Sequence, residues 1–146
     1  MIHIKKFEDY VNEGIIRKVT SDTFRSKSLI IDSNKRKIFL DEIENKIGVK
    51  DENSNYFIEN CYDIIIQLLR SKLILNGYKA SGQGAHIAEV SYMKKIGFLD
   101  EDMYFMNELR HFRNGIKYYG KRFDKEYANK TIKFMKKCSK FLENQK

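Results

Sequence analysis

The sequence predicts an all-α fold: an up-down antiparallel bundle of four to five main helices, preceded by a short N-terminal helix. Three observations support this prediction. The 146 residues contain no proline, the residue that interrupts helix interiors. Apolar residues recur at spacings of three and four, which places them on one face of a helix. Glycines fall mostly between these segments, so the connections are short and favour antiparallel neighbours.

The first two helices have clear boundaries in the sequence. A short helix is expected over 7–12, because Gly14 follows it and glycine commonly ends helices. The run Thr20-Ser21-Asp22 supplies hydroxyl caps and an acidic side chain for the start of the second helix. We expect that helix to continue to about Ile47, just before Gly48.

The third helix should be the most buried one. It begins at Ser54 or Asn55 and extends to Asn76-Gly77. The segment 62–75 is apolar over a wide arc, which is typical of a helix surrounded by others. A loop is expected over 78–84.

Three further segments complete the bundle. The fourth helix should run from His86 to about Ile96, the fifth from Asp100 to Gly120, and the sixth from Asp124 onward. In the sixth helix the inward residues are expected to be Tyr127, Thr131, Phe134, Met135, Cys138, Phe141 and Leu142. Its lysines, Lys130, Lys133, Lys136, Lys137 and Lys140, fall largely outside.

The composition fits one domain over residues 1–146, large enough to bury a core without disulfides. Cys61 and Cys138 lie on apolar stripes and are expected to be reduced. The three histidines lack metal-ligand spacing, so no metal or cofactor is expected. No apolar run approaches the roughly 20 residues that span a membrane, and the first residues lack the apolar core of a signal peptide. We therefore expect a cytoplasmic protein that does not contact membranes.

The net charge of +8 is concentrated at one end of the chain. Residues 1–108 hold 16 Lys and Arg and 17 Asp and Glu, whereas residues 109–146 hold 12 and 3. This asymmetry favours a polyanionic partner, most plausibly nucleic acid. A solvated lysine-rich helix face explains the terminal lysines equally well.

The fifth helix combines an apolar stripe with a polar flank. The stripe consists of Phe105, Leu109, Phe112, Ile116 and Tyr119. Arg110, Arg113 and Lys117 share one flank and repel one another, so a facing acid or a bound phosphate must compensate. His111, Gly115 and Tyr118 form another stripe. Glycine costs about 1 kcal/mol relative to alanine inside a helix, so Gly115 indicates close approach by another helix or a ligand.

These residues resemble the signature helix of HEPN-domain proteins. The similarity lies in Arg113-Asn114-Gly115-Ile116-Lys117-Tyr118-Tyr119-Gly120, preceded by Glu108-Leu109-Arg110. The family pattern is an arginine, then a polar residue that is often asparagine, then a histidine four to six residues later. The turn at 76–79, before a loop and His86, also resembles small prokaryotic members.

The resemblance implies a helical bundle that forms a homodimer, with the signature helices of both copies lining one cleft. Many HEPN domains are metal-independent endoribonucleases in which Arg and His promote attack of the 2′-hydroxyl on the adjacent phosphate. Others are toxins paired with small nucleotidyltransferases, or modules that bind RNA or a nucleotide without catalysis. By resemblance, Arg113 contacts phosphate and Asn114 is the adjacent polar residue.

The chain departs from the family pattern where the histidine is expected. Tyr118 and Tyr119 occupy those positions, and a phenol is a poor general base at neutral pH. Tyrosine can instead orient a 2′-hydroxyl or stack on a base. His111, on the Tyr118 face, is an alternative source of an imidazole. His86 is interpreted as structural.

The candidate catalytic residues are therefore Arg113, Asn114 and Tyr118, and the candidate RNA-binding residues are Arg110, His111, Lys117 and Tyr119. Two functional hypotheses follow. The first is an RNA-binding homodimer with endoribonuclease activity. The second is a non-catalytic module that docks a nucleotidyltransferase partner or a nucleotide. A basic DNA-binding bundle is less favoured, because the short helix-turn-helix spacing is missing.

Non-functional interpretations remain open for several of these residues. Arg113 can form an ion pair with Glu108 or with an acid on another helix. Tyr119 can pack in the core with its hydroxyl on a partner. Tyr118 is equally compatible with a dimer interface and with a binding site.

Overall fold

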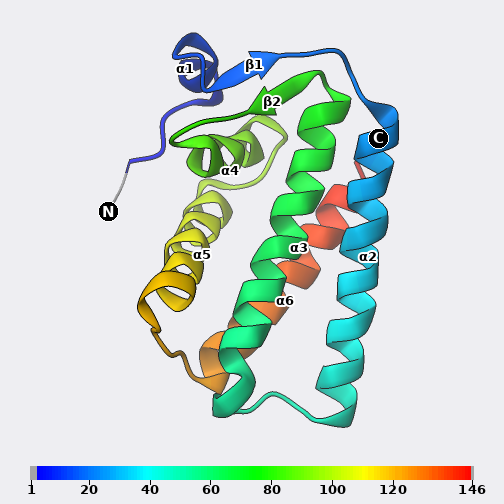
Figure 1. The fold of residues 1–146 in the computed structure, drawn as a ribbon, viewed down its shortest axis with the longest axis vertical. Helices are drawn as coiled ribbons and strands as arrows, with labels where there is room; N and C mark the ends of the chain where they lie inside the picture. Colours follow the sequence, from blue (N-terminus) through cyan, green and yellow to red (C-terminus); the bar gives the residue numbers. More distant parts are fainter. Residues whose placement is uncertain (1–2, 146) are drawn as a thin grey trace.

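The structure, a computed structural model, describes residues 3–145 and has the expected all-α fold (Figure 1). Within this range six helices pack against one another. A two-stranded antiparallel sheet accompanies them, which we call the hairpin although α2 and α3 separate its strands in the chain. In chain order the elements are α1 (Phe7–Asn12), β1 (Ile16–Lys18), α2 (Thr23–Lys46), the 3-10 turn η1 (Asp51–Asn53), α3 (Ser54–Leu75), β2 (Tyr78–Ala80), α4 (Ala85–Lys95), α5 (Asp100–Tyr119) and α6 (Lys125–Glu143).

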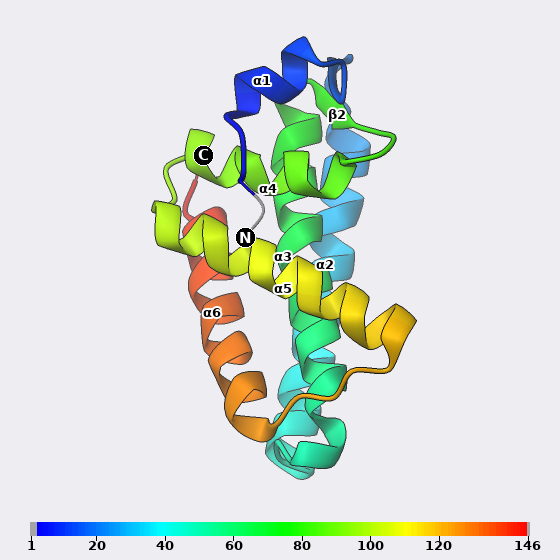
Figure 2. The ribbon, with the colours of Figure 1, turned by 90° about the vertical axis from the view of Figure 1, so that its left-hand side faces the viewer.

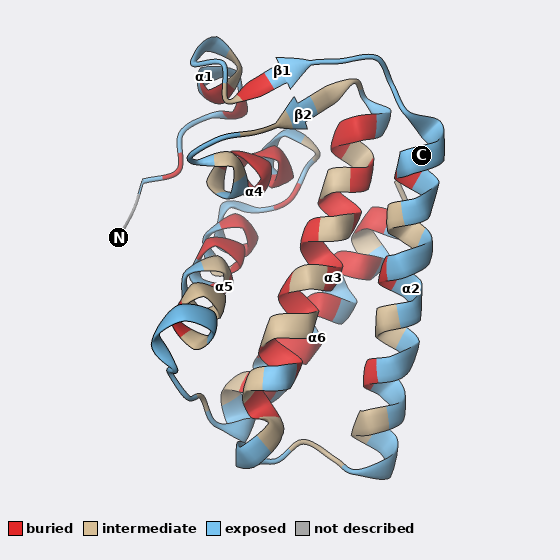
Figure 3. Cartoon of the chain, in the orientation of Figure 1, coloured by how far each residue is buried: buried red, intermediate tan, exposed pale blue. Residues whose placement is uncertain are grey.

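Helix α3 forms the centre of the core. It contacts α2, α4, α5 and α6, and most of its side chains are buried (Figure 3). Phe57, Ile64 and Ile65 have no exposed surface. Burial of a large apolar side chain contributes about 1.5–3 kcal/mol, so α3 supplies much of the stability.

The local signals for helix ends operate as the sequence predicts. Asp22 caps α2, its carboxylate accepting a hydrogen bond of 2.9 Å from the backbone N–H of Arg25. Asp124 caps α6 through the backbone N–H of Tyr127 at 2.9 Å. Each contact satisfies a backbone donor that has no partner inside its helix.

The hairpin corrects the expected loop over 78–84, because its first three residues form β2. Strands β1 and β2 are antiparallel, with Ile16 opposite Ala80 and Lys18 opposite Tyr78. Gly77 precedes β2 with a φ of +82°, and an added Cβ there would lie 3.0 Å from the Val19 carbonyl oxygen. Three-residue strands are too short to give a detectable alternation of apolar and polar residues. The hairpin lies at the end of α3, beside α4.

Helices α2 and α3 run antiparallel, whereas α5 crosses α3 and α6 at a steep angle (Figure 2). The first part of α5 therefore packs on the bundle, and its C-terminal end projects beyond α3. This crossing places one flank of α5 against α3 and leaves the last turn of α5 uncovered.

Candidate functional site

Arg113 of α5 is held by an acidic residue of α3. Its Nε donates a hydrogen bond of 3.1 Å to Oδ1 of Asp63, and its guanidinium carbon lies 5.6 Å from the centre of the Tyr62 ring. This pair identifies the facing acid as Asp63, not Glu108. No hydrogen bond within residues 3–145 uses the terminal nitrogens of Arg113. The pair therefore orients the guanidinium and leaves its outer donors available for an oxyanion.

Arg110 lies one turn earlier and has a neutral partner. Its Nε donates to Oδ1 of Asn107 at 2.9 Å, and Asn107 is buried. Within the described residues no carboxylate pairs with Arg110. Its positive charge is consequently positioned but not neutralised by an ion pair.

Arg70 of α3 forms a bidentate pair with Glu89 of α4. Its Nε and Nη2 donate to the two carboxylate oxygens at 2.6 and 2.9 Å. Glu89 is only 3% exposed. A buried carboxylate requires a compensating charge, so this pair holds α3 and α4 together and fixes the Arg70 guanidinium.

The buried hydroxyl of Tyr62 experiences the positive charge of three guanidinium groups. Tyr62 is 1% exposed, and its hydroxyl has no hydrogen-bond partner among residues 3–145. Burial raises the pKa of the phenol, and the Glu89 carboxylate adds to this effect. Three positive charges act in the opposite direction, those of Arg110, Arg113 and Arg70. We call these three residues the arginine cluster.

An unpartnered buried hydroxyl costs about 1–3 kcal/mol. It is therefore unusual in a folded protein. Here it lies within the electrostatic reach of the arginine cluster. The members of the cluster suited to hold a phosphate group are Arg110 and Arg113, which are partly exposed on α5.

His86 in the first turn of α4 lies within reach of the same charges. His86 is exposed to solvent. Loss of hydration on the packed side lowers the pKa of the imidazole; Glu89 opposes this, and the arginine cluster lowers the pKa further. The lowered pKa of His86 favours the neutral form of its imidazole. The sequence interpretation of His86 as structural did not consider these charges.

Acidification should destabilise the protein through His86. Because the pKa of folded His86 lies below its ordinary value of 6.5, the unfolded chain binds the proton first as the pH falls below about 6.5. We expect the urea midpoint to decrease from pH 7.5 to pH 5.5, and to decrease less in His86→Gln. His111→Gln, on the exposed surface of α5, is the control and should keep the wild-type dependence. An unchanged dependence in His86→Gln would contradict the lowered pKa.

The other predicted residues of α5 form no hydrogen bond or ion pair with the arginine cluster within residues 3–145. His111, Lys117 and Tyr118 are exposed, and Asn114 is partly buried. Leu109 of the predicted stripe is fully buried, but Tyr119 is 80% exposed, so its expected packing in the core was wrong. The reason is the projection of the last turn of α5 beyond α3 (Figure 2).

Gly115 has an intramolecular role. A Cβ at this position would lie 3.0 Å from Cδ of Lys121, a residue of the loop that follows α5. The backbone N–H of Lys121 also donates to the Gly115 carbonyl at 3.2 Å. The close neighbour is therefore the chain's own loop, which removes Gly115 as a reason to expect a dimer.

Three residues of this site were not found from the sequence: Asp63, Arg70 and Glu89. Each is a charged residue in a helix whose neighbours are largely apolar and buried. That pattern is a usable signal, since charged residues are seldom buried without partners. The pairing itself depends on how α3, α4 and α5 cross.

Comparison with models of protein families, with curated proteins and with solved structures gives no match for this chain. No helix among residues 3–145 is long and apolar enough to cross a membrane. Within the same residues no group of three or more His, Cys, Asp or Glu is placed to hold a metal ion. The chemistry of the arginine cluster is therefore the basis for a functional assignment.

Proposed function

We propose that this protein binds RNA at the arginine cluster, in the manner of the HEPN-domain proteins that its fifth helix resembles. The observation that supports this proposal is the pair of partly exposed guanidinium groups on α5, those of Arg110 and Arg113, whose hydrogen bonds within residues 3–145 use only their Nε atoms. Arg110 and Arg113 would hold a backbone phosphate through charge-assisted hydrogen bonds. Arg70 is already paired with Glu89 and adds fixed positive charge.

The exposed end of α5 extends this surface. Tyr118 and Tyr119 are 67% and 80% exposed, and the Lys117 ammonium lies 5.6 Å from the centre of the Tyr118 ring. Aromatic side chains next to a basic groove allow bases to stack while the backbone is held, each stacked base contributing about 1–3 kcal/mol. We assign these tyrosines to base stacking.

We extend the proposal to metal-independent RNA cleavage, with His86 as the base. A neutral His86 would accept the proton of the 2′-hydroxyl as the 2′-oxygen attacks the adjacent phosphorus. The bond to the 5′-oxygen breaks, leaving a 2′,3′-cyclic phosphate and, after protonation, a 5′-hydroxyl. Arg113 would stabilise the added negative charge at phosphorus. In this proposal His86, rather than Tyr118, replaces the histidine of the family pattern.

The decisive experiment compares Arg113→Ala with wild type on a mixed-sequence RNA in EDTA, measuring binding and cleavage. A hydrogen bond to a charged group contributes about 1.5–3 kcal/mol, so RNA affinity should fall about tenfold or more. The matched control is Lys133→Ala, which removes one positive charge from the exposed face of α6. It should have little effect on affinity.

Two further measurements make this test specific. Arg113→Lys keeps a positive charge for Asp63 but loses the planar guanidinium. Its affinity for RNA should therefore lie between those of wild type and Arg113→Ala. Thermal unfolding shows whether each variant is folded. Equal losses of affinity in Arg113→Ala and Lys133→Ala would indicate a diffuse basic surface and contradict the proposal. Cleavage that disappears in His86→Gln, with binding retained, would support the catalytic part.

A second candidate function is docking of a protein partner, such as a nucleotidyltransferase. It is favoured by an open groove of about 1000 Å³ that is lined by α5 and by Lys130 of α6. Tyr104, Phe105 and Phe112 provide its aromatic surface, and Lys130 lies 5.0 Å from the centre of the Phe105 ring. A stable complex with a co-encoded protein that is lost in Phe112→Ala, without RNA binding by wild type, would favour this function.

A further inference from the structure

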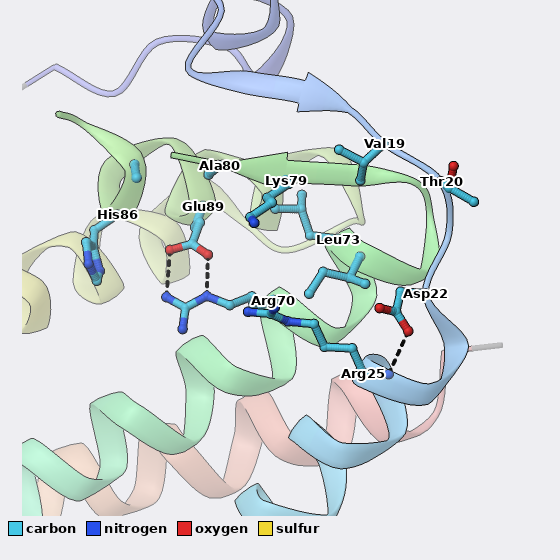
Figure 4. Close-up of a pocket in the computed structure, with 12 residues that line it drawn as sticks. Val19, Thr20, Asp22, Arg25, Arg70, Leu73, Lys79, Ala80, His86 and Glu89 are labelled. Carbon is cyan, nitrogen blue, oxygen red and sulfur yellow. Dashed lines mark hydrogen bonds and ion pairs between the residues drawn. The ribbon is translucent and has the colours of Figure 1, made fainter. Parts of the chain in front are cut away.

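A second cavity lies next to the arginine cluster, between the hairpin and the ends of three helices (Figure 4). It has a volume of about 460 Å³, within the range of about 300–1,000 Å³ typical of small-molecule sites. We call it the hairpin pocket. Its lining comes from the start of α2, the end of α3, strand β2 and the first turns of α4, and the residues used below are Val19, Arg25, Arg70, Lys79, Ala80 and His86.

Two positive charges in the hairpin pocket have no acidic partner. Within residues 3–145 no hydrogen bond or ion pair uses the side chain of Arg25 or Lys79. Both acidic side chains of the pocket already accept hydrogen bonds. Asp22 accepts one from the backbone N–H of Arg25, and Glu89 accepts from the guanidinium of Arg70. Figure 4 shows the Arg25 and Lys79 side chains extending toward the space beside Arg70. The pocket therefore presents free cations to a ligand.

The rest of the pocket wall is apolar. Val19 and Leu73 line the pocket together with Ile74, Ala80 and Ala85. An inorganic anion alone would leave this apolar surface unused. A ligand that fits both walls carries a phosphate group on a flat or apolar body, and a nucleotide has this composition.

The hairpin pocket shares Arg70 with the arginine cluster. Arg70 lines the pocket and belongs to the cluster. His86 also lines the pocket, and the charges of the cluster lower its pKa. A strand bound along the cluster could thus place its end in the pocket. Only this part of the inference rests on the proposed RNA binding.

We propose that the hairpin pocket binds a phosphate monoester of a nucleoside, through Arg25 and Lys79 on the phosphate and Val19 and Ala80 on the base. The ligand is either the 5′-phosphorylated end of an RNA strand or a free nucleoside monophosphate. Both present the same chemistry, a terminal phosphate with more negative charge than a backbone phosphodiester.

The test uses one short oligoribonucleotide in 5′-phosphorylated and 5′-hydroxyl forms, with AMP, CMP, GMP and UMP as free nucleotides. We expect wild type to prefer the phosphorylated strand by about tenfold, and Lys79→Ala and Arg25→Ala to lose this preference. Lys27→Ala, an exposed basic residue of α2 outside the pocket, is the control and should keep it. All three side chains are exposed, so the variants should remain folded, which thermal unfolding verifies.

The outcomes separate this proposal from the proposed function. If Arg113→Ala weakens both strands equally and keeps the preference, both proposals are supported. If nucleoside monophosphates bind wild type, depend on Lys79, and no strand binds, the pocket is supported and RNA binding is not. If neither the 5′-phosphate preference nor nucleotide binding depends on Arg25 and Lys79, the hairpin pocket proposal is overturned.

Discussion

Replacing Arg70 with alanine should lower the free energy of unfolding by about 3–5 kcal/mol, the typical cost of leaving one member of a buried ion pair without its partner. The cause is Glu89, whose side chain is 4% exposed and whose two oxygens both accept hydrogen bonds from Arg70. Without the guanidinium, the carboxylate is either desolvated without compensation or must become protonated. Urea denaturation at pH 7.5 measures this loss.

The matched control for this prediction is an exposed ion pair. Lys94 and Asp100 lie 2.9 Å apart, with side chains 60% and 62% exposed. Exposed pairs contribute little, because water solvates and screens both charges. Lys94→Ala should therefore leave the urea midpoint nearly unchanged.

A double variant isolates the buried charge. Arg70→Ala combined with Glu89→Ala removes both partners and should be more stable than Arg70→Ala alone. If Arg70→Ala were no less stable than Lys94→Ala, Glu89 would not be buried between α3 and α4 as described.

Phe57→Ala should have a comparable effect for a different reason. Phe57 on α3 has no exposed surface and belongs to the main core. Truncation of a buried phenylalanine costs about 3–5 kcal/mol, from lost burial and from the cavity that remains. Thermal or urea unfolding would detect the change.

The chain offers a control with the same chemistry for Phe57→Ala. Phe24 at the start of α2 is 81% exposed, so Phe24→Ala removes the same atoms without opening a cavity. Its stability should stay close to that of wild type. Similar losses in the two variants would contradict the central position of α3.

These two predictions also define which positions suit functional tests. Arg25 and Lys79 are exposed, and the Arg113 side chain is 22% exposed beside an Asp63 that is 26% exposed. Their replacement should cost less stability than Arg70→Ala, because water reaches the remaining groups. Arg70 is a poor choice for a binding test, since loss of binding and loss of stability would coincide.

Much of the fold follows from local features of the sequence. The caps at Asp22 and Asp124 mark where α2 and α6 begin. Glycines with positive φ, such as Gly48 and Gly120, follow the ends of α2 and α5. The wide apolar arc of α3 predicted the most buried helix. All of these depend on interactions within a few residues, so the sequence alone contains them.

The candidate site could be predicted only in part. The basic flank of α5 was visible from spacing, and Arg113 and Arg110 lie there in the structure. Residues brought from other elements were not predictable, because nothing within α5 specifies that Asp63 faces it or that His86 lies nearby. Tyr119 shows the same limit, since helical periodicity assigns a face but not where the neighbouring helix ends.

The sequence by itself determined the helices, their limits, the central core helix and the basic character of the last segments. Only the tertiary structure decided the short hairpin, the Asp63 and Glu89 ion pairs, the contact of Gly115 with Lys121 and the hairpin pocket. Helix formation and capping depend on neighbours three or four residues away. Ion pairs and pockets depend on the angle at which α5 and α4 cross α3, which is set by packing of the whole core.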